Sequence, residues 1–265
     1  MKIGFIGAGK MAGAIINGII SSEILQPNEI AVYDINQDVC NHYQTKGYQV
    51  SKTIGELVSN CKYIVLSIKP QHFSEVIEQV KSKATCNHVF VTIMAGISAQ
   101  SIKTSVGFDA KVIRVMPNTP LLVGYGSIAL SRVNPASIEE FEFVKKIFAS
   151  AGKVEEISPD MMNEVIPLNG SSPAYIYLFA KNFVDRAVEL GFNKETANNL
   201  FCNTLIGCAK MMMETGKSHQ ELIDMVTSKG GTTYKGLEAL SKNHFDQALL
   251  ECFDDTIKRA YELGK

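Results

Sequence analysis

Short apolar runs alternate with helical patterns through the first half of the chain. Runs rich in β-branched and aromatic residues predict strands at residues 3–6, 30–33, 63–68, 89–94, 112–115 and 127–130. Between the first two runs, apolar residues recur at positions 12, 15, 16, 19 and 20, the spacing of one helix face. Strands this apolar are usually buried on both sides by crossover helices. The pattern therefore predicts an α/β fold with a doubly wound parallel sheet over residues 1–157.

The last third of the chain shows only helical patterns. Helices are predicted at residues 173–190, 195–215, 220–227, 232–240 and 245–263. Residues 174–180 of the first are apolar on every side, and a helix of this kind must be buried. Because so few helices cannot bury it alone, we expect an all-helical domain over residues 158–265 that forms at least a homodimer.

Charge and cysteine usage narrow the class of partner. The 265 residues carry 26 basic and 27 acidic side chains, a net charge of −1 that argues against a nucleic-acid-binding face. The longest uncharged run, residues 84–102, contains too many polar side chains to span a membrane. The six cysteines form no CxxC pair, which favours reduced thiols in a cytosolic protein and no metal site. We therefore expect a small-molecule partner, with no nucleic acid and no membrane.

A glycine-rich motif, Gly7-Ala8-Gly9-Lys10-Met11-Ala12, follows the first predicted strand and opens a helix. In that context the spacing G-x-G-x-x-A indicates a dinucleotide-binding loop. Gly7 permits a tight turn, Gly9 lets the backbone approach a pyrophosphate, and Ala12 lets the helix pack closely on the strand. An ordinary strand–turn–helix connection is the alternative interpretation.

Asp34 ends the second predicted strand, and neither lysine nor arginine follows it before Lys46. A carboxylate at this position accepts hydrogen bonds from the adenosine ribose and repels a 2′-phosphate. On this ground the residues favour NADH over NADPH. The alternative is that Asp34 only caps the turn that follows it.

Two further strand ends carry candidate ligand-binding residues, because open α/β sheets bind ligands at the carboxyl ends of their strands. Ser67, Lys69 and Pro70 lie at one of these ends, and Ala95 and Gly96 at the other. We expect Pro70 to turn the chain across the cofactor and Gly96 to leave room for it. Lys69 is otherwise a solvated surface charge.

Three polar segments lie farther along the chain. Asn118 stands in a proline-framed loop after another predicted strand. Ser171 and Ser172 lie at the start of a predicted helix, where they either contact a small ligand or cap the helix. Ser228-Lys229-Gly230-Gly231-Thr232-Thr233 precedes a further helix. Its glycines expose backbone N–H groups at a helix start, which is the form of a carboxylate-binding site.

Together these motifs resemble those of the pyrroline-5-carboxylate reductases over essentially the full length of the chain. The matching segments are GAGKMA, IKPQ, MAG, RVMPNTP, GSSPAY, ETG and KGGTTYKGLEAL. The resemblance implies that NAD(P)H reduces the cyclic imine of pyrroline-5-carboxylate to L-proline, the last step of proline biosynthesis. It also implies a Rossmann domain followed by a helical dimerisation domain, with dimers assembled into larger rings.

The resemblance also assigns site residues. It implies that the glycine loop holds the pyrophosphate and that Ser67, Lys69 and Ala95 line the nicotinamide. The expected cofactor-binding residues are Ile6, Gly7, Ala8, Gly9, Lys10, Met11, Asp34, Ser67, Lys69, Pro70, Ala95, Gly96 and Asn118. The expected substrate-binding residues are Ser171, Ser172, Gly230, Gly231, Thr232 and Thr233, with Thr233 and Lys69 as the catalytic candidates. The glycine amides would hold the substrate carboxylate, and Thr233 would hydrogen-bond the ring nitrogen.

The chain departs from the family pattern at two places. Lys229 stands where proline is common, and Asp34-Ile35-Asn36 replaces a serine or asparagine followed by a basic residue. Two other readings remain open: a hydroxyacid dehydrogenase or general imine reductase on the same plan, and a dinucleotide-binding relative without activity. The first has no reason to carry the SKGGTT loop. The second would be expected to have lost Lys69, Thr233 or the glycine pairs, all of which are present.

Overall fold

The computed structural model describes residues 2–264, and the chain divides into two units. The first, called here the sheet unit, contains the chain up to Pro173 together with the residues from Asp255 onward. The second, the helical unit, is Ala174–Asp254. This division differs from the predicted boundary after residue 157, because Met162 and Ile166 pack against Met116 and Ala129 of the sheet.

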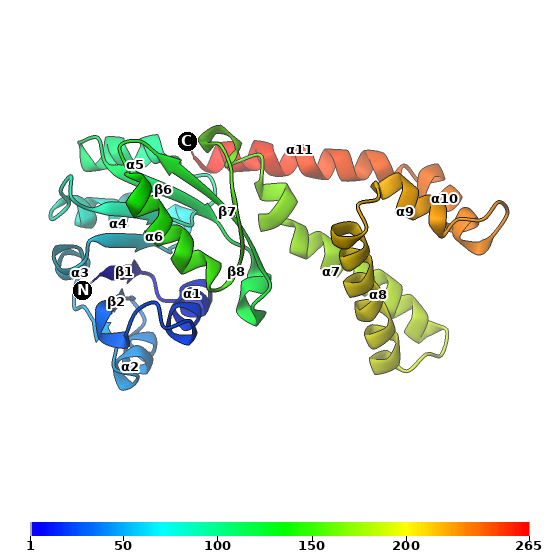
Figure 1. Ribbon diagram of the computed structural model, residues 1–265, viewed down its shortest axis with the longest axis horizontal. Coiled ribbons are helices and arrows are strands. Elements are labelled where there is room, and N and C mark those ends of the chain that lie inside the picture. The colour runs from blue at the N-terminus through cyan, green and yellow to red at the C-terminus, as the bar shows by residue number, and fades with distance from the viewer. Residues whose placement is uncertain (1, 265) are drawn as a thin grey trace. The chain divides into compact units, whose positions relative to one another are not determined.

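The sheet unit contains an eight-stranded sheet in the order β3-β2-β1-β4-β5-β6-β7-β8 (Figure 1). Its strands are β1 (Ile3–Ile6), β2 (Ile30–Tyr33), β3 (Gln49–Val50), β4 (Tyr63–Leu66), β5 (Val89–Thr92), β6 (Lys111–Met116), β7 (Gly126–Val133) and β8 (Gly152–Glu156). The pairings from β3 across to β6 are all parallel, which confirms the doubly wound Rossmann-type sheet.

The far edge of the sheet departs from the expected all-parallel arrangement. Strand β7 runs antiparallel to β6, and β8 is parallel to β7. The connection from β6 to β7 is a short turn built on the 3₁₀-helix Thr119–Val123, and a connection of this length cannot make the crossover that a parallel pair needs. Strands β3 and β8 were not expected from the sequence. The first has two residues, and the second reads Gly-Lys-Val-Glu-Glu, which lacks an apolar strand pattern.

Helices cover both faces of the sheet. They are α1 (Lys10–Ser21), α2 (Gln37–Thr45), α3 (Ile54–Asn60), α4 (Phe73–Lys81), α5 (Ala99–Val106) and α6 (Ile138–Ala149). Successive strand residues point to opposite faces, so Phe5 and Val65 join a core with α1 and α6. Ile64 and Phe90 join a second core with α3, α4 and α5. Both faces of the strands are therefore buried, as their apolar sequences predicted.

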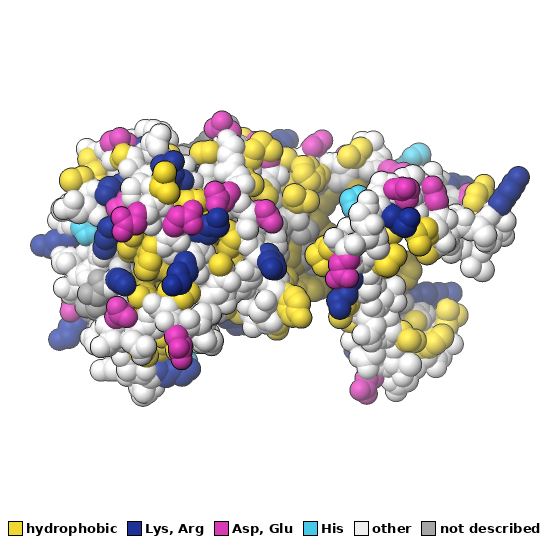
Figure 2. Space-filling model, in the orientation of Figure 1, with side chains coloured by type: hydrophobic (Ala, Val, Ile, Leu, Met, Phe, Trp, Pro, Cys, Tyr) yellow, Lys and Arg dark blue, Asp and Glu magenta, His cyan; other side chains and the backbone are white. Residues whose placement is uncertain are grey.

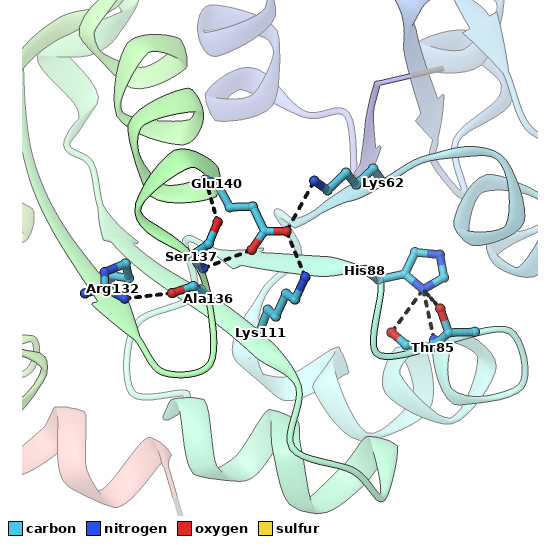
Figure 3. Close-up of polar contacts among 8 residues, drawn as sticks. All are labelled: Lys62, Thr85, His88, Lys111, Arg132, Ala136, Ser137 and Glu140. Atoms are coloured by element: carbon cyan, nitrogen blue, oxygen red, sulfur yellow. Dashed lines mark hydrogen bonds and ion pairs between the residues drawn. The ribbon is translucent and has the colours of Figure 1, made fainter.

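A buried carboxylate fastens α6 to the amino ends of two strands (Figure 3). Glu140 is 5% exposed; its Oε1 accepts from Lys111 Nζ at 2.8 Å and lies 3.2 Å from Lys62 Nζ. Its Oε2 accepts from the backbone N–H of Ser137 at 3.0 Å, which closes a capping box. Burial alone would raise the pKa of Glu140, but the bonds from Lys111, Ser137 and Lys62 outweigh it and lower the pKa to about 2.

The helical unit contains α8 (Lys194–Glu214), α9 (His219–Met225) and α10 (Thr232–Lys242). Helix α7 (Ser172–Glu189) runs into it from the sheet unit, and α11 (Phe245–Leu263) leaves it. All five helices lie within two residues of the predicted bounds. Four phenylalanine rings from α7, α8 and α11 contact one another in pairs, with centroids 4.5–6.4 Å apart: Phe179, Phe183, Phe201 and Phe245.

Most apolar side chains of the helical unit are not buried. Of its described residues, only Val184 and Ala197 are buried, whereas Met213 is 74% exposed and Leu190 is 68% exposed. Hydrophobic side chains are visible at the surface over α8 and α9 (Figure 2), where a methionine-rich hollow of about 480 Å³ lies between the two helices. Within residues 2–264, the helices are too short or too polar to cross a membrane.

Candidate active site

A cleft of about 490 Å³ lies at the carboxyl ends of β1, β2 and β4 in the sheet unit. In an open α/β sheet this is the switch point at which the strand order reverses, and it is where such sheets bind ligands. The cleft is lined by Ile6, Gly7, Gly9, Tyr33, Asp34, Ile35, Ile54, Ser67, Ile68, Lys69, His72, Glu75, Val76 and Gln79. Six of the expected cofactor-binding residues are therefore brought together: Ile6, Gly7, Gly9, Asp34, Ser67 and Lys69.

The two glycines of the loop before α1 differ in what requires them. Gly7 has φ +87°, and a β-carbon there would lie 2.6 Å from the carbonyl oxygen of Ser67. The fold itself therefore requires glycine at this turn. Gly9 has an ordinary φ of −70°, and a β-carbon there would meet no atom within 4 Å. Its missing side chain leaves open space at the start of α1.

The start of α1 is suited to an anion. Gly9 is the N-cap and supplies no side-chain hydrogen bond, so first-turn N–H groups remain without a cap. The first turn contains no acidic residue. Backbone amides and the helix dipole at such a position favour a phosphate. The open space beside Gly9 and the uncapped amides together fit the pyrophosphate of a dinucleotide.

Asp34 performs the turn-capping role and also lies in the cleft. Its Oδ1 accepts from the N–H of Asn36 at 2.9 Å, and its Oδ2 accepts from the N–H of Ala8 at 2.8 Å. The carboxylate thus ties the glycine loop to the end of β2. Because each carboxylate oxygen has two lone pairs, both can still accept a ribose hydroxyl.

Ser67 and Lys69 have different surroundings at the end of β4. The Ser67 hydroxyl donates to the carbonyl of Gly7 and lies 3.1 Å from the carbonyl oxygen of Ile6, so it braces the ends of β1 and β4. Lys69 is exposed and forms no ion pair with any described residue. It is therefore an available cation in the cleft.

Several cleft residues were missed by the sequence reasoning. His72, Glu75, Val76 and Gln79 follow the helical spacing i, i+3, i+4 and i+7, so they share one face at the start of α4. That spacing was readable from the sequence once Pro70 had marked the end of the strand. Ile35 lies two residues after the last residue of β2 and is 91% exposed. This exposure of an apolar side chain, which only the structure shows, marks Ile35 as a residue of the cleft.

Other expected cofactor residues lie outside the lining of this cleft: Ala8, Lys10, Met11, Pro70, Ala95, Gly96 and Asn118. Ala8 is buried and takes part through its N–H bond to Asp34. Asn118 is 7% exposed, and its Oδ1 accepts from the N–H of Ser127 at 2.9 Å. The side chain of Asn118 therefore holds the turn between β6 and β7.

The reason given for Gly96 was wrong. A β-carbon at Gly96 would lie 2.7 Å from the carbonyl oxygen of Ala260 and 2.9 Å from the β-carbon of Leu263. The space beside Gly96 is therefore filled by the end of α11 and is not left for a cofactor. Its φ of +79° is a second reason for glycine at this position.

The expected substrate loop lies in the helical unit, immediately before α10. Gly230 has φ +76°, and Gly231 donates its N–H to the carbonyl of Ser228 at 2.9 Å. Gly231 is the N-cap of α10 and receives no side-chain cap, so the amides at this helix start are available to an anion. Thr233 is exposed, and its hydroxyl makes no hydrogen bond with a described residue. Thr233 therefore does not cap the helix, and its hydroxyl is available to a ligand.

The remaining substrate candidates lie in the sheet unit. The Ser172 hydroxyl donates to the carbonyl of Leu168 at 2.9 Å, where the π-helix Ile166–Gly170 leads into α7. The backbone N–H of Ser171 donates to the carbonyl of Ile166 at 2.8 Å. Ser172 thus acts in the helix junction, while the Ser171 side chain is partly exposed.

A doubly wound sheet with a glycine loop and an open switch-point cleft defines a dinucleotide-binding protein. Comparison with known families agrees: residues 2–96 match the family model "NADP oxidoreductase coenzyme F420-dependent". Residues 159–263 match the model "Pyrroline-5-carboxylate reductase dimerisation".

Individual relatives cover the whole chain. The pyrroline-5-carboxylate reductase of Arabidopsis thaliana is 36% identical, with 100% of this chain and 96% of the relative covered. That of Escherichia coli K12 is 32% identical, covering 100% and 98%. The crystal structure of Plasmodium falciparum pyrroline carboxylate reductase with NADP bound has a TM-score of 0.91 at 28% identity, covering 100% and 98%. The chain belongs to the pyrroline-5-carboxylate reductase family.

Proposed function

We propose that this chain catalyses hydride transfer from NADH or NADPH to the cyclic imine of L-1-pyrroline-5-carboxylate, giving L-proline. The proposal depends on one observation: this chain, a member of the family, contains two sites of different kinds that suit an anion. The switch-point cleft suits a dinucleotide, and the uncapped amides at the start of α10 suit a small carboxylate.

The chemistry needs little from an acid or base on the protein. A ring imine is basic enough to be partly protonated near neutral pH, and its iminium carbon is already electrophilic. NAD(P)H supplies the hydride that forms the new C–H bond, and the C=N electron pair becomes the nitrogen lone pair. The protein contributes binding, alignment and exclusion of water.

Each site residue has a role in this scheme. The amides of Gly230 and Thr232 hold the substrate carboxylate, whereas the Gly231 N–H donates to the Ser228 carbonyl and shapes the loop. The Thr233 hydroxyl hydrogen-bonds the ring nitrogen. We assign Lys69, an exposed lysine of the cleft, to the nicotinamide side of the bound cofactor. No step requires Lys69 to become covalently attached to the substrate.

The test follows the oxidation of each reduced cofactor with pyrroline-5-carboxylate while proline is quantified in the same sample. We expect substrate-dependent oxidation, with one proline formed for each cofactor molecule oxidised. Oxidation without proline, or no oxidation with either cofactor, would overturn the proposal. A 3-hydroxyacid with oxidised cofactor is the control, since a rival hydroxyacid dehydrogenase would oxidise it.

Cofactor choice is the finer part of the proposal. We expect NADH to be used at an efficiency close to, or above, that of NADPH, because the Asp34 carboxylate would face a 2′-phosphate. Asp34→Ser should shift the efficiency ratio toward NADPH by about 1–2 kcal/mol. The substitution also removes the bond to Ala8 N–H, so binding of both cofactors should weaken and the ratio is the diagnostic quantity.

The matched control for this variant is Asp38→Asn, which removes another exposed carboxylate two residues into α2. Asp38 does not line the cleft, so its variant should leave the NADH to NADPH ratio unchanged. A wild-type enzyme that prefers NADPH a hundredfold would show that Asp34 does not oppose the 2′-phosphate.

The assembly and the cytosolic compartment are proposed on separate grounds. Exposed apolar side chains on the helical unit support a homodimer, or a ring of such dimers, formed through residues 173–263. All six cysteines are free thiols, which is typical of a cytosolic protein.

A further inference from the structure

The last turn of α11 lies against the loop that follows β5, far from it in sequence and within the same sheet unit. This contact involves backbone on both sides. A β-carbon on Gly264 would overlap the carbonyl oxygen of Gly96, and one on Gly96 would overlap Ala260. Because both positions are glycines, the backbone of the helix end and the backbone of the loop approach each other more closely than side chains would permit.

Apolar packing extends the contact of the helix end to Ala95, the residue before Gly96 in the loop. Ala260 is 3% exposed and belongs to a buried cluster with Met116 and Met162, and Ala95 packs against this cluster. Ala95 is one of the residues expected to line the nicotinamide. Its position is therefore set in part by the helix end and not only by β5.

Polar contacts fix the same turn from the other side. The Tyr261 hydroxyl donates to Glu164 Oε1 at 2.5 Å. Arg114, which is 7% exposed, donates to Asn163 Oδ1 at 3.0 Å and has favourable electrostatic contact with Glu164. Arg114 pairs in register with Thr92, the last residue of β5. The helix end is thus linked through Glu164 to Arg114 of β6, which lies beside the end of β5, the strand from which the Ala95–Gly96 loop starts.

We propose that residues 260–264 form a positioning element that holds the Ala95–Gly96 loop, so that the nicotinamide ring is aligned for hydride transfer. The proposal rests on the proposed reductase function. Hydride transfer is sensitive to sub-ångström placement, and a misplacement of 1 Å can cost about a hundredfold in rate. Cofactor affinity comes mostly from the glycine loop and the cleft, which this turn does not touch.

Two variants disturb the turn in different ways. Gly264→Ala places a methyl group against the Gly96 carbonyl and leaves the rest of α11 intact. Truncation after Ala260 removes the Tyr261 bond together with the glycine contact. Arg259→Gln is the matched control, because it breaks only the exposed Arg259–Glu262 ion pair on the same turn.

We expect Gly264→Ala and the truncation to lower kcat about tenfold. The affinity for NADH should stay within about twofold, and the primary isotope effect with 4-deuterated NADH should increase. Tyr261→Phe should change kcat and the isotope effect in the same direction by about threefold or less, and Arg259→Gln should change neither. Residues 93–97 should exchange their amide hydrogens faster in the truncated chain whether or not a substrate is present.

The exchange measurement separates this inference from the function on which it rests. If the wild type does not reduce pyrroline-5-carboxylate, the proposed function fails, and the exchange of residues 93–97 still reports whether the turn holds the loop. Unchanged exchange in the truncated chain would overturn the inference. A truncated chain with the kcat and isotope effect of the wild type would also overturn it. The same holds for a truncated chain whose melting temperature is lower but whose kcat per folded molecule is unchanged.

Discussion

The two units of the chain bury their apolar side chains to very different extents. The sheet unit has two large cores, one on each face of its sheet, in which residues such as Phe5 and Phe90 are fully buried. In the described part of the helical unit, only Val184 and Ala197 are buried, and they keep 8% and 6% exposure. The difference teaches that the sheet unit contains its own hydrophobic core, whereas the helical unit needs a further surface to cover its helices.

The functional loops follow the same division. The glycine loop of the sheet unit is braced by Ser67 and Asp34 through bonds to its backbone. The loop before α10 in the helical unit is exposed and has an uncapped helix start. One unit therefore presents a cleft whose geometry is already fixed, and the other presents an uncapped helix start beside an exposed hydroxyl.

The largest expected effect tests how far the sheet unit depends on internal contacts. Glu140→Gln should lower its unfolding free energy by about 3 kcal/mol at pH 7, since a pKa lowered from 4.5 to about 2 corresponds to that difference. Because the folded-state pKa is the lower one, this stabilisation is fully present above about pH 5 and is lost as the pH falls toward 2. Urea unfolding at matched protein concentration, from pH 7 down to pH 2.5, measures it.

The control is Glu156→Gln, which removes the exposed partner of Lys145 in the same unit. Its unfolding free energy should be nearly unchanged at every pH, because exposed pairs contribute little. Equal effects of the two substitutions would contradict the structural role assigned to Glu140.

A second prediction concerns the free hydroxyl in the helical unit. Thr233→Val keeps the shape of the side chain and removes its hydrogen-bonding group. A hydrogen bond to a charged partner contributes about 1.5–3 kcal/mol, so turnover at saturating cofactor should fall about 10- to 150-fold. NADPH affinity and melting temperature, measured on the same sample, should hardly change. Near-normal turnover would remove Thr233 from the site.

A smaller effect separates the two glycines of the braced loop. Gly9→Ala should leave the melting temperature unchanged and weaken cofactor binding about tenfold, because its methyl group enters open space next to the expected pyrophosphate. Gly7→Ala should instead lower stability by more than about 1 kcal/mol, because of its positive φ and the nearby Ser67 carbonyl. Fluorescence titration with NADH and thermal melts on both variants check the pair. Unchanged affinity in Gly9→Ala would contradict the assigned loop role.

The sequence predicted regular elements well where hydrophobic periodicity was strong. The apolar strands of the parallel part and all five late helices lie within two residues of expectation at most of their ends. Strand β8 was missed because an edge strand such as Gly152–Glu156 need not be apolar on either face. The reversal at β7 depends on the short connection before it, which hydrophobic patterning does not report.

The candidate site was predicted less completely, for a related reason. Motif reading predicted that Gly7, Gly9 and Asp34 lie together, as they do in the cleft, because their placement depends on local backbone geometry. It expected open space beside Gly96 because it could not know that Ala260, from the other end of the chain, fills that space. Contacts between residues so far apart in sequence become visible only in the folded chain.

The contrast between the two units is tested most directly by the mass of the wild-type protein in solution. Light scattering at micromolar concentration should give a mass of at least two chains of 29.0 kDa each. The exposed apolar helices, with Met213 at 74% and Leu190 at 68% exposure, would then be covered by a second copy. A stable monomer at that concentration would contradict the account, because the helical unit would then persist with its apolar surface uncovered.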